Sequence, residues 1–561
     1  MTRHIDLQYQ KRDTQDTAKF VAALKQNAVN EKGVFDSAAS DAFISEAINQ
    51  SAQGSVKIPE KLGIVLDEAG DRSTNITQAI LDGVNSYERQ HGATAPADLI
   101  AQAIHLAYAT TDAAKTRYSL DSAADSNHSA NLSLQPNRAI VAILSALGEA
   151  IPFAHYLPAD ISSNEAKLAI LSHQAGNTYG AYAAGGLMDG TSSGDAYVTS
   201  SRVHATTNSS GAHSGQLTSV QATDETCTAV GGAVVAVNLL RGRTLVYVNG
   251  QVVAREINTT GSGASTISGE VTIAGVTSLI GGTINTDTGA IALTSTPALA
   301  DIVPVHVEGF IDYERMPSLT PSIITAVDTF SLYAKPWRVI TQQTIDSRTQ
   351  MSNELGLDPY SESIIGIQAQ VGNERHYQVL RMARRLGLNN TGAFDFLWST
   401  MGLQKDRGQI WRDFAAVLGA VSQKMAVDTM SHGISHLYVG KYVAAQMQSL
   451  PSDIFQSSGI SARPSVYRVG RLFGLYEVYY TPKVLTDSGS ASQVMCIGRA
   501  NDVTRNPFVL GDAVPSTIIP LAVNADLKSG AGYYARNFTS VNPHGPSALG
   551  CALINVTNMG M

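Results

Sequence analysis

The distribution of charge along the chain is the feature that most constrains its fold. Residues 168–334 carry only 17 charged side chains in 167 positions, and none of them is lysine. Residues 1–167 carry 34, so the density of charge halves at that point. A lightly charged stretch can be core, disorder or interface, and strand-like alternation of apolar residues argues against disorder. We therefore expect much of this stretch to contact other protein chains.

The composition of the whole chain excludes several classes of protein. The 561 residues are enough for about three to four domains, and 44% apolar residues with a net charge of -8 can bury a large core. A mildly acidic chain is not a nucleic-acid clamp. No run of about 18 apolar residues predicts a membrane span, and the start, MTRHIDLQYQKRD, lacks the apolar centre of a secretory signal. Cys227, Cys496 and Cys551 are too widely spaced for a disulfide framework or a zinc site, and we expect buried thiols.

Residues 1–115 are predicted to be helical. Apolar side chains recur there at helical spacing in three groups: Phe20, Val21, Leu24 and Ala28; Ile76, Ile80, Leu81 and Val84; Leu99, Ile100, Ile104 and Leu106. The pattern favours a small helical domain or arm, and the alternative is an extension that scaffolds assembly. A polar, extended segment should follow over 118–135, and then a short apolar helix that Pro152 stops.

Residues 168–318 are predicted to be β structure with many turns. Of the 48 glycines, 19 fall between 171 and 290, where threonine and serine are also abundant. Asn249-Gly250 lies between alternating β-branched residues, and both positions of a type I′ hairpin turn need positive φ. A second hairpin is expected over 282–294, with Gly289 in its loop. The block reads as a β-rich insert on a long hairpin.

Two long helices follow an extended segment at 319–345. The first should begin with Asp358 as N-cap and Pro359 at the first helical position, and it should end at Gly387. Its length of about 28 residues would span ~42 Å, which suits a spine. The second is marked by apolar residues at helical spacing: Ile410, Phe414, Val417, Leu418, Val421 and Met425.

The remainder of the chain is predicted to be mixed α and β. A short helix should end at Gln448. The expected strands are His436–Gly440, Leu472–Tyr480, Gln493–Ile497, Thr517–Val523 and Cys551–Val556.

No catalytic, cofactor-binding or metal-binding constellation emerges from the motifs. His432 and His436 are four residues apart, but Gly-Ile-Ser lies between them in place of the glutamate that a zinc protease needs, so we expect ordinary histidines at a strand edge. There is no phosphate-binding loop and no nucleophile elbow. Arg381, Arg384 and Arg385 could meet phosphate, although arginines at a helix C-terminus more often offset the helix dipole.

Four segments, in this order, resemble the major capsid proteins of tailed bacteriophages, which have the Hong Kong 97-type fold. The segments are INTDTGAIALTSTPALADIVPVHVEGFIDYER (284–315), DSRTQMSNELGLDPYSESIIGIQAQVGNERHYQVLRMAR (346–384), HLYVGKYVAAQMQSLP with YRVGRLFGLYEVYYTP, and ARNFTSVNPHGPSALGCALINVTNM (535–559). They are similar to the hairpin insert of large myovirus capsid proteins, their spine helix with an internal Glu-Arg pair (here Glu374-Arg375), their axial-domain hairpin and their closing strands. The resemblance covers residues 160–561.

The resemblance implies an α+β fold of the Hong Kong 97 type, with a defined order of parts. These would be an N-terminal helical arm (1–115), an extended N-arm (116–165), an E-loop with a β-rich insertion domain (166–318), a P-domain with the spine helix (319–400), and an A-domain with closing P-domain strands (401–561).

The same resemblance implies a structural protein and no enzyme. Copies of the chain would form pentamers and hexamers and close into an icosahedral shell around DNA, which they enclose without specific binding. Decoration, cement and portal proteins would be further partners, and the location would be the virion, assembled in the host cytoplasm. No cofactor and no membrane are implied.

Two departures from the family carry information. Some members join their subunits by an isopeptide bond from a lysine of the long hairpin, which residues 168–334 cannot form because they contain no lysine. Many members also lose an N-terminal segment by proteolysis. Because the chain begins at Met1, we expect residues 1–115 to remain as an arm inside or between subunits.

Three other functions of the chain remain open as hypotheses. A phage tail sheath or tube subunit would also combine β inserts with lightly charged interfaces. A carbohydrate-active hydrolase would need aromatic platforms, yet Trp337, Trp398 and Trp411 all lie outside the β-rich insert. The insert at about 205–310 could also be a surface module that binds a host or glycan, in addition to a role in a shell.

Overall fold

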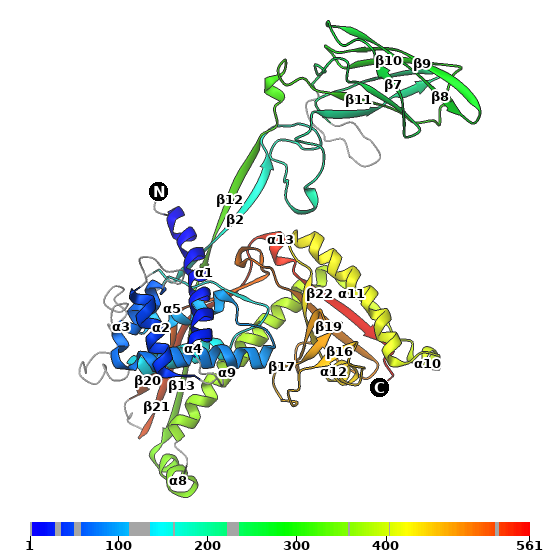
Figure 1. The fold of residues 1–561 in the computed structure, drawn as a ribbon. Helices are drawn as coiled ribbons and strands as arrows, with labels where there is room; N and C mark the ends of the chain where they lie inside the picture. The colour runs from blue at the N-terminus through cyan, green and yellow to red at the C-terminus, as the bar shows by residue number, and fades with distance from the viewer. Residues whose placement is uncertain are drawn as a thin grey trace. The chain divides into compact units, whose positions relative to one another are not determined.

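The computed structural model describes residues 3–28, 35–49, 58–111, 135–160, 163–220, 235–356, 359–402, 404–521 and 527–560. The chain forms two compact units. The body comprises Met1–Ile170 and Thr329–Met561, and the insert comprises Leu171–Asp328. Strands β2 (Glu165–Ala175) and β12 (Ile323–Tyr333) pair with each other and carry the chain from one unit to the other (Figure 1).

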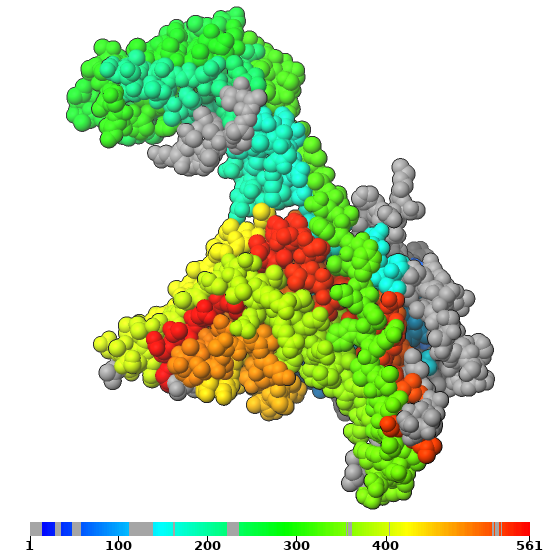
Figure 2. Space-filling model, turned by 180° about the vertical axis from the view of Figure 1, so that it is seen from behind, coloured from blue at the N-terminus to red at the C-terminus, as the bar shows by residue number. Residues whose placement is uncertain are grey.

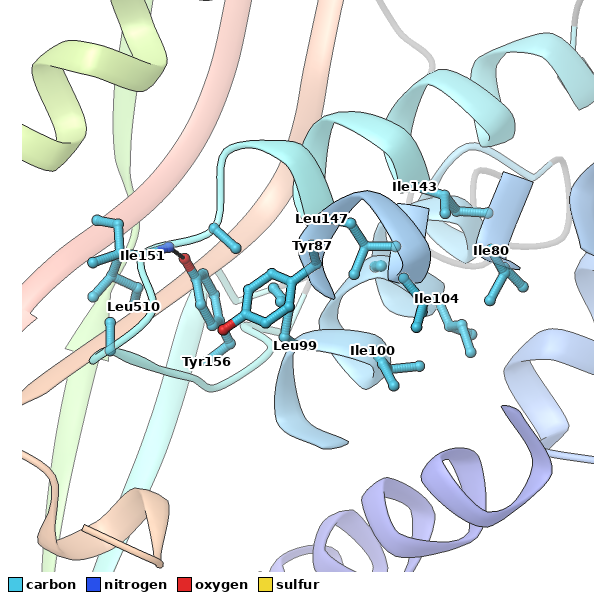
Figure 3. Close-up of a cluster of buried hydrophobic side chains, with 14 of the residues drawn as sticks. Ile80, Tyr87, Leu99, Ile100, Ile104, Ile143, Leu147, Ile151, Tyr156 and Leu510 are labelled. Atoms are coloured by element: carbon cyan, nitrogen blue, oxygen red, sulfur yellow. Dashed lines mark hydrogen bonds between the residues drawn. The ribbon is translucent and has the colours of Figure 1, made fainter. Parts of the chain in front are cut away.

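Helices make up the first part of the body, as the apolar spacing predicted. They are α1 (Arg3–Asn27), α2 (Ser37–Asn49), α3 (Glu60–Ala69), α4 (Ser73–His91), α5 (Ala97–Ala109) and α7 (Gln135–Gly148). Helix α5 is the central one, because every side chain from Asp98 to Ala109 is buried. Figure 3 shows Ile80, Leu99, Ile104 and Leu147 meeting between α4, α5 and α7.

These helices share one apolar core with the rest of the body. The core runs from the N-terminal helices through α9 (Pro359–Leu386) to strands near the C-terminus, and includes Phe20, Leu24, Ile80, Ile104, Val379, Leu380, Tyr438, Tyr479, Phe508 and Leu553. At the junction, the Tyr156 hydroxyl accepts a hydrogen bond of 2.9 Å from the backbone N–H of Ile151 (Figure 3). The described helices within residues 1–115 are therefore packed into the body.

A four-stranded sheet supports the long helix α9. Its order is β1 (His155–Tyr156), β20 (Phe508–Leu521), β21 (Lys528–Val541) and β13 (Lys335–Thr344), so β13 is an edge strand. Val371 of α9 packs on Tyr533 and Ala535 of β21. Helix α9 has the 28 residues that the sequence predicted, and α8 (Ile345–Leu355) precedes it. The expected N-cap, Asp358, lies outside the described residues.

A seven-stranded sheet forms the other half of the body. Its order is β14 (Thr391–Asp395), β22 (Cys551–Thr557), β19 (Ala491–Gly498), β15 (Ile434–Val439), β18 (Tyr476–Tyr480), β17 (Tyr467–Leu472) and β16 (Phe455–Ser457). Helices α10 (Trp398–Met401), α11 (Arg407–Thr429), α12 (Lys441–Gln448) and α13 (Gly545–Ala548) accompany it. Ile410, Phe414 and Leu418 of α11 enter its core, as their spacing predicted.

Two strand predictions need correction. The single strand expected over Leu472–Tyr480 is the second half of a hairpin, because Phe473 and Gly474 have φ of 52° and 69° and turn the chain between β17 and β18. The strand expected at Thr517–Val523 begins nine residues earlier, at Phe508, and pairs with β21 over most of its length. The sequence pattern does not predict the first part of β20 as a strand, because Gly511 and Asp512 interrupt its run of apolar residues.

The insert is a nine-stranded antiparallel sheet. Its order is β3 (Ser201–Ala205), β11 (Val305–Phe310), β6 (Leu245–Val248), β7 (Gln251–Glu256), β8 (Ala264–Ile273), β9 (Val276–Asn285), β10 (Ala290–Thr296), β5 (Ala212–Gln216) and β4 (Thr207–Ser209). Asn249 and Gly250 have φ of 49° and 78°, which confirms the predicted type I′ turn between β6 and β7. Gly289 has φ of 72° in the second predicted hairpin.

The insert begins and ends later in the chain than the E-loop that the sequence predicted. The insert runs from 171 to 328, where the sequence placed an E-loop at 166–318. The extended segment 319–345 consists of β12 and β13, which are separated by Ala334. Within 116–165, the described part begins with helix α7, the short apolar helix expected before Pro152.

Removing a large side chain from α5 should weaken the whole body. Ile104 is buried in the shared core, so Ile104→Ala should lower the free energy of unfolding by about 2–5 kcal/mol. The exposed Leu144→Ala on α7 is the control and should change it by less than about 1 kcal/mol. The measurement is the denaturant midpoint followed by tryptophan fluorescence, since all three tryptophans lie in the body. Equal midpoints for the two variants would contradict a shared core.

Changing the turn between β6 and β7 should damage the insert alone. Valine strongly disfavours the positive φ that Asn249 and Gly250 adopt, so a Val-Val replacement should destabilise the nine-stranded sheet. Limited proteolysis should then cut within 171–328 while the body stays intact. Simultaneous loss of both units would show that they do not fold separately.

Candidate assembly surfaces

Helix α9 is fixed in the body by a buried ion pair. The Arg375 guanidinium lies 3.0 Å from the Asp512 carboxylate of β20, and its Nε donates to Thr539 at 3.3 Å. Gln102 of α5 donates to the other Asp512 oxygen at 3.2 Å, so the N-terminal helices join the same network. Burial alone would lower the pKa of Arg375, but the Asp512 carboxylate raises it above its ordinary value. Of the Glu374-Arg375 pair in the sequence, arginine therefore points inward, while Glu374 is exposed.

The long extended segment exposes apolar side chains on both of its faces. Ile323 and Ile324 of β12 are adjacent, and adjacent residues of a strand point to opposite faces. Both are more than half exposed. The same holds in β13, where Ile340 is 67% exposed beside a partly exposed Val339. Strand β12 forms a two-stranded ribbon with β2, which is only marginally stable in water, so contact with another surface would stabilise it, whereas β13 is the edge of a four-stranded sheet.

A groove lies beside the edge strand β13. It has a volume of about 560 Å³ and is lined by Trp337, Arg338 and Val339 of β13 and by Gly366, Ile367 and Gln370 of α9. Among the strands that the structure describes, β13 pairs only with β21, which leaves its other edge without a partner there. Unpaired backbone groups beside an apolar groove are suited to receiving a segment of another chain.

The insert also exposes large apolar side chains. Ile302 is 90% exposed, and Val198, Ile257, Val276 and Leu279 are each more than half exposed. Strands β8, β9 and β10 alternate between buried apolar and exposed residues, most of which are small or hydroxylated. The outer face of this sheet therefore carries few charges, as the sequence indicated.

The histidines and cysteines singled out in the sequence do not form a site. His436 is buried in β15, His432 precedes that strand, and neither ring nitrogen of His432 has a hydrogen-bond partner. Cys496 and Cys551 are free and buried, and Cys227 lies outside the described residues. No group of side chains suited to a metal ion occurs within the described ranges. Among those same residues, no helix is both long and apolar enough to cross a membrane.

The sequence did not reveal a buried polar network in the body. His155 lies 3.0 Å from the Asp98 carboxylate through Nδ1 and 2.8 Å from the Ala500 carbonyl through Nε2, and the Tyr156 N–H donates to Asp98 at 2.7 Å. Burial alone would raise the pKa of Asp98, but the hydrogen bond from His155, with the charges of His155 and Arg499, lowers it below its ordinary value.

Four other histidines lie around the same core, of which His105 and His436 are buried and His91 and His376 are partly buried. The rings of His91 and His376 lie 3.0 Å and 3.1 Å from the hydroxyls of Tyr479 and Tyr438, respectively. Burial, with nearby positive groups in the case of all but His376, lowers their pKa values: His91, His105 and His436 to about 3, and His376 to about 4. These rings are therefore neutral in the folded body at neutral pH. The partners of His91, His105 and His376 lie 44 to 388 residues away in the sequence, so no local motif marks these three histidines, whereas His436 contacts its neighbour Ser435 at 2.7 Å.

Comparisons with known proteins give similar solved structures only. No family model matches the chain, and no curated protein matches it. The capsid of jumbo bacteriophage PhiKZ is similar over 72% of this chain and 91% of that chain, with 9% identity and a TM-score of 0.35. The chain is also similar to the capsid of Myoviridae phage XM1 (43% and 78% covered, 10% identity, TM-score 0.28) and to a structure from Microbacterium phage Oxtober96 (60% and 96% covered, 12% identity, TM-score 0.29). The two capsids are of the kind that the sequence resembles.

Mild acid should destabilise the body. A histidine whose pKa is lowered by folding binds a proton more readily when unfolded, so stability is complete above the unfolded pKa near 6.5 and falls as the pH drops toward 3 to 4. Each such histidine contributes a loss of about 1.4 kcal/mol per pH unit in that range. Denaturant midpoints at pH 7.5, 6 and 5 should show a progressive fall.

A variant pair separates this effect from general acid sensitivity. His376→Gln removes one neutral ring from the core. The free energy of unfolding should then fall less steeply with decreasing pH, by the contribution of one bound proton, about 1.4 kcal/mol per pH unit. His173→Gln, at a half-exposed ring in the insert, should leave the fall in the body unchanged. A midpoint that is flat from pH 7.5 to 5 would contradict neutral buried histidines.

Proposed function

We propose that the chain is the major capsid protein of a tailed bacteriophage, a structural protein that self-assembles into the head shell. The observation that carries the proposal is the extended segment β12–β13, which exposes isoleucines on both faces. Fully burying one such side chain contributes roughly 1.5–3 kcal/mol. A shell subunit would bury these side chains against neighbouring copies.

The finer division into Hong Kong 97-type parts belongs to the same proposal. Residues 166–318 would form the E-loop with its insertion domain, 319–400 the P-domain around α9, and 401–561 the A-domain with closing strands. The 28-residue α9 beside an edge strand, and the two strands β2 and β12 that lead to the insert, support this assignment. Pentamers and hexamers of the chain would enclose DNA, and portal and decoration proteins would join them in the virion.

Closure of this shell would rest on surface contact. Residues 168–334 contain no lysine, so neither the insert nor β12 can supply a lysine for a covalent bond between subunits, and Lys167 at the start of β2 lies just outside that range. Non-covalent shells need interfaces well above the standard ~1,600 Å². The low charge of the insert favours such contact, because few charged groups would have to be desolvated. Within the described residues, no feature favours the tail-tube or hydrolase alternatives.

The proposal is tested by making the exposed isoleucines polar. Ile324→Gln with Ile340→Gln places two amides where apolar contact is expected, and should shift the sedimentation profile from large particles to single subunits. Far-ultraviolet circular dichroism should stay unchanged, because both side chains are already exposed in the subunit.

The control is another exposed apolar residue of the body. Leu475→Gln changes a 72% exposed side chain in the turn between β17 and β18, away from the extended segment in sequence, and should still give large particles. Particles of unchanged size from the double isoleucine variant would contradict the proposed role of β12–β13.

A further inference from the structure

The outer face of α9 carries three arginines that the shell contacts above do not use. Arg381, Arg384 and Arg385 follow each other at the i, i+3 and i+4 spacing that places side chains on one face of a helix. All three are exposed, while Leu380 and Ala383 of the same turns are buried in the core. Figure 2 shows the yellow-green stretch of the chain that contains α9 at the surface of the body.

Two further cations lie beside this face. A groove of about 440 Å³ is lined by Arg381 and Tyr377 of α9, by Lys483, and by Pro464 and Ser465. The Lys483 ammonium lies 5.3 Å from the centre of the Tyr377 ring. Arg463 immediately precedes Pro464 and is also exposed. The groove also receives amide groups from Gln370 and Asn373, which can donate hydrogen bonds.

The positive charge of this region is not balanced within the described part of the chain. None of Arg381, Arg384, Arg385, Arg463 and Lys483 forms an ion pair there, and Glu374 is the only acidic residue that lines the groove. The helix dipole supplies only about half a negative charge at the C-terminus of α9. An excess of about three positive charges therefore remains, on a chain whose net charge is -8.

Helix α11 shows the contrasting arrangement. Its exposed cations Arg412 and Lys424, and Lys405 just before the helix, are each paired with an aspartate. The pairs are Lys405 with Asp413, Arg412 with Asp453, and Lys424 with Asp428, at 2.6 to 2.7 Å. These three surface cations are thus neutralised by a nearby acid. Arg381, Arg384 and Arg385 have no such ion-pair partner among the described residues, which favours an anion from outside the subunit.

We propose that this face, defined by Arg381, Arg384, Arg385, Arg463 and Lys483, binds double-stranded DNA through its phosphates. Guanidinium groups match phosphate oxygens with two parallel hydrogen bonds, and several cations on one face suit a polymer of phosphates. Contacts to phosphate do not read sequence, so binding would be non-specific and weak, with a dissociation constant of about 10⁻⁴ to 10⁻⁶ M. That the DNA is an enclosed genome rests on the proposed function; the binding face itself rests on the charges.

The test uses the full chain with the Ile324→Gln and Ile340→Gln changes, so that assembly does not hide the face. Fluorescence anisotropy of a labelled DNA duplex is measured over a range of salt concentrations. With five phosphate contacts, the logarithm of the binding constant should fall against that of the salt concentration with a slope of about -4.5. Changing Arg381, Arg384 and Arg385 together to glutamine should weaken binding and reduce the slope by about 2.7.

A matched triple variant controls for net charge. Changing Lys405, Arg412 and Lys424 to glutamine removes the same number of exposed cations. Because these cations are already paired with aspartates, the salt dependence of DNA binding should keep its slope. Equal loss in both triple variants would overturn the proposal, as would an absence of binding at low salt.

Particle formation by the arginine variant in the otherwise unchanged chain is a separate readout. The variant should still assemble, and loss of assembly would identify the face as a subunit contact and overturn the proposal. Failure of the unchanged chain to form particles would contradict the shell function, while DNA binding in the salt series would still support this face.

Discussion

Burial of one side of α9 in the shared core is the interaction on which the rest of the structure depends. Val379, Leu380 and Ala383 pack into the same core as the N-terminal helices, and Arg375 ties the helix to Asp512 of β20. Because Gln102 also contacts Asp512, the N-terminal helices stabilise the sheet that carries α9. The helical residues at the start of the chain are thus part of what holds the spine, in addition to any role in assembly.

Fixing one side of α9 determines what its other side can do. Toward its N-terminus, the open side lines the groove beside β13, with Ile367 and Gln370 among the lining residues. Toward its C-terminus, the open side carries the three arginines. One helix therefore separates a surface suited to protein contact from a surface suited to phosphate. The scarcity of charge in the insert and the unpaired positive charge on α9 fit two different partners, the neighbouring subunit and DNA.

Local patterns predicted the elements that local physics determines. Helices α9 and α11 follow their apolar spacing, and the hairpin at Asn249-Gly250 follows from the positive φ of its two residues. The sequence could not show which elements share a core, because the contact of His91 with Tyr479 joins residues 388 apart. The local pattern at Leu472–Tyr480 was interpreted as one strand, although the resemblance of YRVGRLFGLYEVYYTP to an axial-domain hairpin indicated a turn, and the pairing of β17 with β18 confirms that hairpin. Of the candidate surfaces, the sequence indicated the low charge of the insert and the arginine run. The exposure of β12–β13, and the lack of ion-pair partners for Arg381, Arg384 and Arg385 among the described residues, could be known only from the packed structure.

The central claim is that copies of this chain form a closed shell and cover β12–β13 in doing so. Electron cryomicroscopy of the purified full-length chain tests this most directly, because it shows both the form of the particles and the surroundings of each strand. We expect closed polyhedral shells built from fivefold and sixfold groups of subunits, in which Ile323, Ile324 and Ile340 are buried against neighbours. Open tubes, or single subunits at high protein concentration, would contradict the account, and so would closed shells that leave those three side chains exposed.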